Sequence, residues 1–125
     1  LPGDLEIRAH LRLHYERRLE EIDEIIVPFK GYKYFTSNYI FPVILKNSDT
    51  DKRNRVRENL AKAGIQTSVH YPAVHRFSIY REFASPLPKT EYVADNLITL
   101  PMFSKLTPEQ VDYICDTIKE AVKSA

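Results

Sequence analysis

Apolar side chains recur through the first 26 residues at spacings of four, four, three and four, which is the spacing of one face of an α-helix. Charged residues occupy the positions between them. The pattern predicts a helix over residues 5–26, ended by Pro28 and Gly31. Its apolar face is formed by Leu11, Tyr15, Leu19, Ile22 and Ile26.

Residues 32–45 are rich in aromatic and β-branched side chains, which predicts a long strand. Pro42 cannot donate a hydrogen bond to a neighbouring strand, so we expect an edge position or a bulge there. Residues 47–51 predict a turn that caps a second helix. Val56, Leu60 and Ala63 share one face of that helix, which is expected to end at Gly64.

The second half of the chain alternates short strands with helices. Residues 65–71 alternate in the manner of a half-buried strand that ends at Pro72. Residues 74–83 predict a short helical turn, a short helix carries Val93 and Leu97, and residues 98–101 predict a brief strand. Thr107, Pro108 and Gln110 mark the start of a last helix, because they supply a capping side chain, a proline at the first turn and a reciprocal amide. Its apolar stripe is Val111, Ile114, Ile118 and Val122.

The order helix, strand, helix, strand, helix, strand, helix predicts an α+β fold. We expect a small sandwich in which helices pack on one face of a mainly antiparallel sheet of three to four strands. The length of 125 residues corresponds to one domain.

Composition narrows the classes of function. The net charge is +1, which argues against a nucleic-acid protein, and the longest apolar stretches are far shorter than the ~18 residues of a membrane span. Cys115 is the single cysteine, so no internal disulfide is expected and a reducing cytoplasm fits best. The first residues show neither an initiating Met nor a secretory signal, which leads us to expect that the chain begins within a longer protein.

One polar cluster stands out as a candidate binding site. His70, Tyr71 and His75 surround Pro72 just past a predicted strand end, where their side chains could be presented at one rim of the sheet. Imidazole and phenol groups hydrogen-bond at neutral pH, and a charged histidine favours phosphate or carboxylate. The alternative is that these residues merely end the strand. No third ligand for a metal lies nearby in the sequence.

Other polar features have simpler interpretations. His10 and His14 lie one helical turn apart without the intervening Glu of a metalloprotease motif, so we expect surface histidines. The basic run at 52–57 is interpreted as a solvated face, the aromatic residues of 32–41 as core and interface packing, and Cys115 as a small buried hydrophobe. With no glycine-rich phosphate loop, the chain is either a binding module or one part of a larger enzyme.

Three blocks of sequence occur in a fixed order along the chain. They are residues 63–75 (AGIQTSVHYPAVH), residues 94–102 (ADNLITLPM) and residues 106–112 (LTPEQVD), with Tyr80 and Arg81 between the first two. In this order and at these intervals they resemble the C-terminal, small domain of the DegT/StrS-type sugar aminotransferases. The resemblance extends over residues 8–122.

The resemblance implies a fold-type I enzyme that uses pyridoxal 5'-phosphate (PLP) to transfer an amino group, usually from glutamate, to a nucleotide-linked keto sugar. Such enzymes serve amino-sugar, cell-surface polysaccharide or antibiotic biosynthesis, usually as homodimers. The family's Schiff-base lysine and its other cofactor-binding residues belong to a large domain that these residues do not match. No lysine here lies in a matching motif, so we expect residues 1–125 to be a small domain that is inactive alone.

By the same resemblance, His70, Tyr71 and His75 match family positions that face the substrate side of the cleft. His70 is expected to hydrogen-bond the sugar nucleotide. Two other readings stay open: a stand-alone binding domain without cofactor chemistry, and a lysine-less relative that acts as a dehydratase or a sensor.

Overall fold

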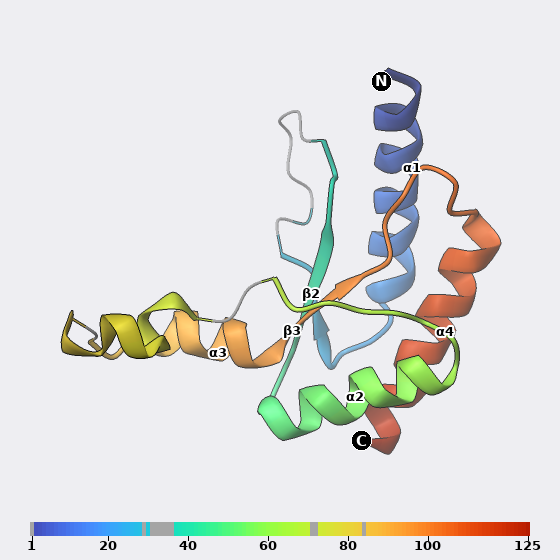
Figure 1. Ribbon diagram of the computed structural model, residues 1–125. Coiled ribbons are helices and arrows are strands. Elements are labelled where there is room, and N and C mark those ends of the chain that lie inside the picture. Colours follow the sequence, from blue (N-terminus) through green and yellow to red (C-terminus); the bar gives the residue numbers. More distant parts are fainter. Residues whose placement is uncertain (1, 29, 31–36, 71–72, 84) are drawn as a thin grey trace.

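The computed structural model describes residues 2–28, 30, 37–70, 73–83 and 85–125 (Figure 1). A three-stranded antiparallel sheet lies against three helices, and a further helix extends away from the sheet. The main hydrophobic core draws its side chains from the sheet and from helices α1, α2 and α4. The predicted α+β fold is therefore confirmed. Within the described residues, no helix combines the length and apolar character needed to cross a lipid bilayer.

Helix α1 spans Pro2–Leu19 and ends earlier than predicted. Leu11, Tyr15 and Leu19 are buried along one face, as the spacing predicts. The chain then turns, and Ile25–Ile26 form strand β1 instead of a last helical turn. Residues 20–24 carry four acidic side chains, which are unfavourable at the negative C-terminal end of a helix.

The sheet order is β1-β2-β3, with β2 (Phe41–Leu45) between β1 and β3 (Leu97–Leu100). The predicted long strand is thus shorter: residues 37–40 lie outside it, and residues 31–36 lie outside the described part of the chain. β1 pairs with only Ile44 and Leu45 of β2. Among the described strands Pro42 consequently has a neighbour on one side only, β3, which agrees with the edge position predicted for it.

The caps predicted from the sequence are confirmed at the starts of α2 and α4 and after the end of α2. Asp49 accepts a hydrogen bond from Lys52 N at 2.8 Å at the start of α2 (Thr50–Lys62), and Gly64 follows the helix with a φ of +83°. At the start of α4 (Pro108–Ser124), Thr107 and Gln110 exchange the two hydrogen bonds of a capping box.

The segment after α2 is not the strand that its alternation predicts. It meets β3 at a single pair, in which Ser68 and Thr99 exchange backbone hydrogen bonds of 3.1 and 2.8 Å. Within the described residues, the segment thus contributes one bridge to the sheet and no strand.

The chain between this segment and β3 forms an extension on the outside of the molecule. It contains two short 3-10 helices, Val74–Arg76 and Ser78–Phe83, and helix α3 (Pro88–Asn96). The predicted helical turn at 74–83 is confirmed, whereas Leu97 belongs to β3 and not to the helix. Figure 1 shows α3 and the 3-10 segment side by side, pointing away from α1 and α4. We call residues 73–96 the arm.

Aromatic and sulfur side chains complete the core. Tyr15 stacks on Phe41 with 4.6 Å between ring centroids, and its hydroxyl donates to Pro101 O at 2.7 Å. Cys115 is buried, and this burial raises the pKa of its thiol to about 12. Cys115 therefore acts as the small hydrophobe that the sequence predicts, since a protonated thiol is a weak nucleophile.

Candidate functional site

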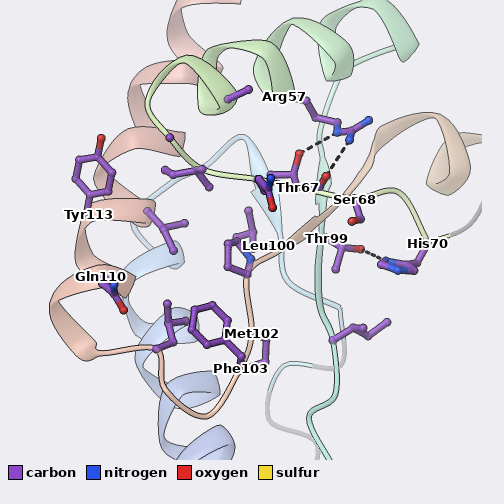
Figure 2. A pocket seen from close by; sticks show the side chains of 18 of the residues that line it. Arg57, Thr67, Ser68, His70, Thr99, Leu100, Met102, Phe103, Gln110 and Tyr113 are labelled. Atoms are coloured by element: carbon purple, nitrogen blue, oxygen red, sulfur yellow. Dashed lines mark hydrogen bonds between the residues drawn. The ribbon is translucent and has the colours of Figure 1, made fainter.

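A groove of about 1410 Å³ opens on the surface of the described residues. It lies between the end of α2, residues 64–68, the end of β3 with residues 101–103, and the first half of α4 (Figure 2). Leu100, Met102 and Phe103 give it an apolar centre. Hydrogen-bonding side chains surround that centre, among them Ser68, His70, Thr99, Gln110 and Tyr113.

His70 is the predicted site residue that lines this groove. Its Nδ1 lies 2.9 Å from Thr99 Oγ1, and the ring is half-buried (Figure 2). Thr99 belongs to β3 and is only 7% exposed. The ring is therefore anchored to a buried residue of the sheet.

His75 lies elsewhere, although only five residues separate it from His70. Its Nε2 is 3.4 Å from Glu91 Oε2 on α3, which is long for a hydrogen bond. Next to it, Arg76 donates to Asp95 at 2.6 Å and to Glu91 at 3.0 Å. His75 is absent from the described lining of the groove. Tyr71, the third predicted residue, lies outside the described residues.

Hydrogen bonds from the backbone and from Arg76 lower the pKa values of two carboxyl groups in the arm. The pKa of Glu91 is lowered, chiefly because its carboxylate accepts the backbone hydrogen bond of Leu87 and then because Arg76 donates to it. The pKa of Asp95 is lowered chiefly by its hydrogen bond from Arg76. Both carboxylates are thus held in the charged form beside a cation.

The basic run on α2 is not the fully solvated face that we predict from the sequence. Arg53 is buried and donates from Nη1 to Ala94 O at 2.9 Å and to Leu97 O at 3.1 Å. Its burial lowers the pKa of its guanidinium. The sequence does indicate that Arg53 is buried. It precedes the buried Val56 by three residues, so the two side chains lie on the same helix face.

Arg57 is a groove residue that the sequence interpretation misses. Its Nε donates to Thr67 Oγ1 and its Nη2 to Thr67 O, both at 2.9 Å (Figure 2). These two bonds fix the residue immediately before Ser68, which pairs with Thr99. The sequence indicates the role of Arg57 less clearly than the burial of Arg53. The partner of Arg57 is Thr67, which lies in a segment that the sequence analysis predicts to be a strand.

The histidines of α1 are at the surface, as expected. His14 Nε2 lies 2.8 Å from Asp112 Oδ1 on α4, and Arg18 also pairs with Asp112. The bonds from His14 and Arg18 lower the pKa of Asp112, in that order of effect. His10 is exposed. These contacts join α1 to α4 and serve packing.

The groove does not by itself fit a PLP site. PLP enzymes hold the cofactor through a lysine, and among the described residues no lysine lines the groove. The polar groups around it are hydroxyl, amide, imidazole and guanidinium groups, with Glu58 as the one carboxylate of the described lining. Such a set suits recognition of an acceptor-rich ligand better than covalent attachment of an aldehyde.

The fold and the groove together define a small α+β unit whose surface groove is lined by apolar and hydrogen-bonding side chains. Residues 3–119 match the model of the DegT/DnrJ/EryC1/StrS aminotransferase family. The chain belongs to this family, which confirms the resemblance drawn from its sequence blocks.

Curated relatives match over nearly the whole chain. dTDP-4-dehydro-2,3,6-trideoxy-D-glucose 4-aminotransferase of Saccharopolyspora spinosa is 27% identical over 124 residues, covering 98% of this chain and 31% of the relative. Erythromycin biosynthesis sensory transduction protein EryC1 of Saccharopolyspora erythraea is 28% identical over 116 residues, covering 90% of this chain and 30% of the relative. The chain thus spans about a third of the length of the relatives it matches.

Among solved structures, the PLP form of Spr1654 from Streptococcus pneumoniae has the same fold, with a TM-score of 0.88 at 28% identity. The match covers 98% of this chain and 32% of that one. That solved structure therefore contains the fold of this chain as roughly one third of its length.

Proposed function

We propose that residues 1–125 are the small domain of a PLP-dependent aminotransferase that acts on a nucleotide-linked keto sugar. The observation that carries this proposal is the match to the family over residues 3–119, together with a relative named as a 4-aminotransferase of a dTDP-linked sugar. The proposed setting is amino-sugar synthesis for a polysaccharide or an antibiotic, in the cytoplasm. Glutamate is the proposed amino donor.

In this proposal the small domain contributes substrate recognition. His70 hydrogen-bonds the sugar nucleotide from the rim of the groove, where its ring is anchored to Thr99. Tyr71 and His75 are proposed to contact the substrate from the same stretch of chain. His75 lies against Glu91 in the arm, so its contribution requires a ligand that reaches beyond the groove.

The cofactor is proposed to be held by a large domain, with the active site lying between the subunits of a homodimer. The absence of lysine from the described lining of the groove supports this division of labour. When bound, PLP supplies the electron sink for amino transfer. The residues of this chain then orient the sugar nucleotide and contribute to excluding water around it.

The test is an activity measurement on the protein expressed from its complete natural reading frame. Given glutamate and a set of nucleotide-linked keto sugars, we expect amino transfer to at least one sugar and the absorbance of bound PLP. His70→Ala should raise KM for the sugar nucleotide by about tenfold, the loss of one good hydrogen bond, with PLP absorbance unchanged. His10→Ala, an exposed histidine on α1, is the matched control.

Two results would contradict the proposal. Loss of PLP binding in His70→Ala with an unchanged binding affinity for the sugar nucleotide would place His70 on the cofactor side. Absence of any amino transfer, in a protein that binds PLP and the sugar nucleotide, would exclude the aminotransferase.

A second candidate is a sensor of the same ligand. The observation that favours it is the relative EryC1, which is named as a sensory transduction protein. Borohydride reduction discriminates between the two, because it fixes PLP covalently only where a lysine forms an imine with it. A reduced, covalently labelled protein supports the enzyme, and an unlabelled protein that still binds the sugar nucleotide supports the sensor.

A further inference from the structure

Helix α3 is short and buries little of its own surface. The nine residues Pro88–Asn96 are all described, and Asn96 alone among them is buried. A helix of this length is marginal in water without support from other parts of the fold. Its place on the molecule therefore depends on contacts from neighbouring elements, and Arg53 of α2 supplies two of them.

Arg53 caps the C-terminal end of α3. Its Nη1 donates to Ala94 O at 2.9 Å and to Leu97 O at 3.1 Å. Ala94 is among the last four residues of α3, whose carbonyl oxygens have no partner within the helix. The chain passes directly into β3 at Leu97, with extended backbone (φ −81°, ψ 136°) and no glycine to close the last turn. The cap consequently comes from α2, 41 positions earlier in the sequence.

The surroundings of Arg53 suit this role. The residue is 8% exposed and lies on the face of α2 that also buries Val56 and Leu60. A cation is favoured at the negative C-terminal end of a helix, which is the end that α3 presents to Arg53. The bond to Leu97 O is itself buried, so its loss would leave an acceptor without this donor and away from water.

The position of α3 also determines the position of His75. The Nε2 of His75 lies 3.4 Å from Glu91 Oε2 on α3. The next residue, Arg76, donates to Glu91 at 3.0 Å and to Asp95 at 2.6 Å. Asp95 directly follows Ala94, whose carbonyl accepts from Arg53. A displacement of α3 would therefore carry the His75 side of the arm with it.

The same helix, α2, also bonds to the chain beside the groove. Arg57 lies one helical turn after Arg53 and donates twice to Thr67, which lines the groove. Thr67 comes before the arm and Ala94 comes near its end. α2 thus holds the chain both where it leaves the groove for the arm and where it returns to the sheet.

We propose that Arg53 is a positioning residue that fixes the arm relative to the groove, so that a ligand extending out of the groove meets His75. The ligand part rests on the function proposed above, in which the ligand is a nucleotide-linked sugar. His70, which lines the groove, and His75 are five residues apart, so their Cα atoms are at most about 18 Å apart. The cap on α3 is present before any ligand binds.

The test compares Arg53→Met, which removes the donors and keeps an unbranched side chain, with Arg53→Lys, whose ammonium group still carries donors. Arg55→Met is the matched control, because Arg55 is an exposed arginine of the same helix. The protein is expressed from its complete natural reading frame. Hydrogen exchange read by mass spectrometry follows peptides of α3 and of α4. Steady-state kinetics give KM and kcat for the keto-sugar nucleotide that the unsubstituted protein aminates.

We expect Arg53→Met to lose most of the protection of residues 88–96, which should exchange more than about tenfold faster, while α4 keeps its rates. KM should rise about threefold with kcat changed less than about twofold, because apparent affinity falls with the fraction of molecules whose arm is in place. Arg53→Lys should show an intermediate increase in exchange, since its side chain is shorter. Arg55→Met should match the unsubstituted protein.

Unchanged exchange of residues 88–96 in Arg53→Met would overturn the proposal. An equal increase in α4 would do so too, because Arg53 would then support the whole fold and not the arm in particular. If Arg53→Met does not fold, Arg53→Lys is judged by the same two criteria.

The ligand part and the proposed function fail in distinguishable ways. Faster exchange of residues 88–96 with an unchanged KM would remove the arm from substrate recognition and overturn the ligand part, while amino transfer by the unsubstituted protein still supports the proposed function. Absence of amino transfer in the unsubstituted protein would contradict the proposed function, whereas the exchange rates would still decide whether Arg53 fixes the arm.

Discussion

His70 beside the groove and His75 in the arm are held by different kinds of contact. His70 is anchored by a buried hydroxyl and by paired backbone, and Arg57 braces the residue before that pair. His75 lies among Arg76, Glu91 and Asp95, which form ion pairs at the surface. Buried neutral hydrogen bonds are little affected by salt, whereas exposed ion pairs are screened by it.

The difference also appears in the apolar side chains. β3 is buried at all four positions, with Ile98 fully buried. The arm instead exposes seven large apolar side chains: Val74, Phe77, Ile79, Tyr80, Leu87, Tyr92 and Val93. Two neighbouring parts of one small fold therefore have unequal local stability, and the arm is expected to open first.

The largest effect should come from removing core volume under the groove. Ile98→Ala should lower the free energy of unfolding by about 2–5 kcal/mol, because it leaves a cavity at a fully buried site. Val93→Ala in the arm, where the side chain is 37% exposed, should cost less than about 1 kcal/mol. Urea unfolding of both variants measures this, and equal losses would contradict the unequal packing of the two regions.

An intermediate effect on stability is expected from removing the two hydrogen bonds that Arg57 donates to Thr67. Arg57→Met should cost about 1–3 kcal/mol, since Thr67 loses two hydrogen bonds and the hydrocarbon stem is kept. Arg55→Met, an exposed arginine on the same helix, should change stability by less than about 0.5 kcal/mol. Thermal unfolding compares them, and amide exchange at residues 67–70 should increase in the Arg57 variant alone.

The smallest effect on global stability, and the clearest dependence on pH, should arise in the arm. The pKa of Asp95 is lowered in the folded state, so its contribution to stability is complete above the ordinary carboxyl pKa of about 4 and is lost as pH falls through the lowered value. Arg76→Gln should raise the pKa of Asp95 toward its ordinary value. NMR titration of the carboxyl carbons measures both.

The same titration provides the control for the arm. Raising the salt concentration should raise the Asp95 pKa in the unsubstituted protein and have little effect in Arg76→Gln, because screening acts on the ion pair. If Arg76→Gln left the pKa of Asp95 unchanged, Arg76 would not be the residue that stabilises the charged carboxylate.

The amino-acid sequence determined those features that depend on neighbours within a few positions. Asp49 and Lys52 are three residues apart, as are Thr107 and Gln110, and Gly64 adopts its own positive φ. Caps and apolar stripes are local, so the starts of α2 and α4, the buried faces and the α+β class follow from the pattern alone. The sequence also singled out His70 through the blocks that it shares with the family.

Only the tertiary structure decided how the candidate site is held. Arg53 reaches Ala94 over 41 positions, and His70 meets Thr99 over 29, so no spacing in the sequence connects them. The pairing of Ile25 and Ile26 with β2 and the single bridge at Ser68 likewise depend on where β2 and β3 lie. The position of a side chain on its own element is a local property of the sequence. The identity of the residue that a side chain contacts is not a local property, because it depends on how the whole chain packs.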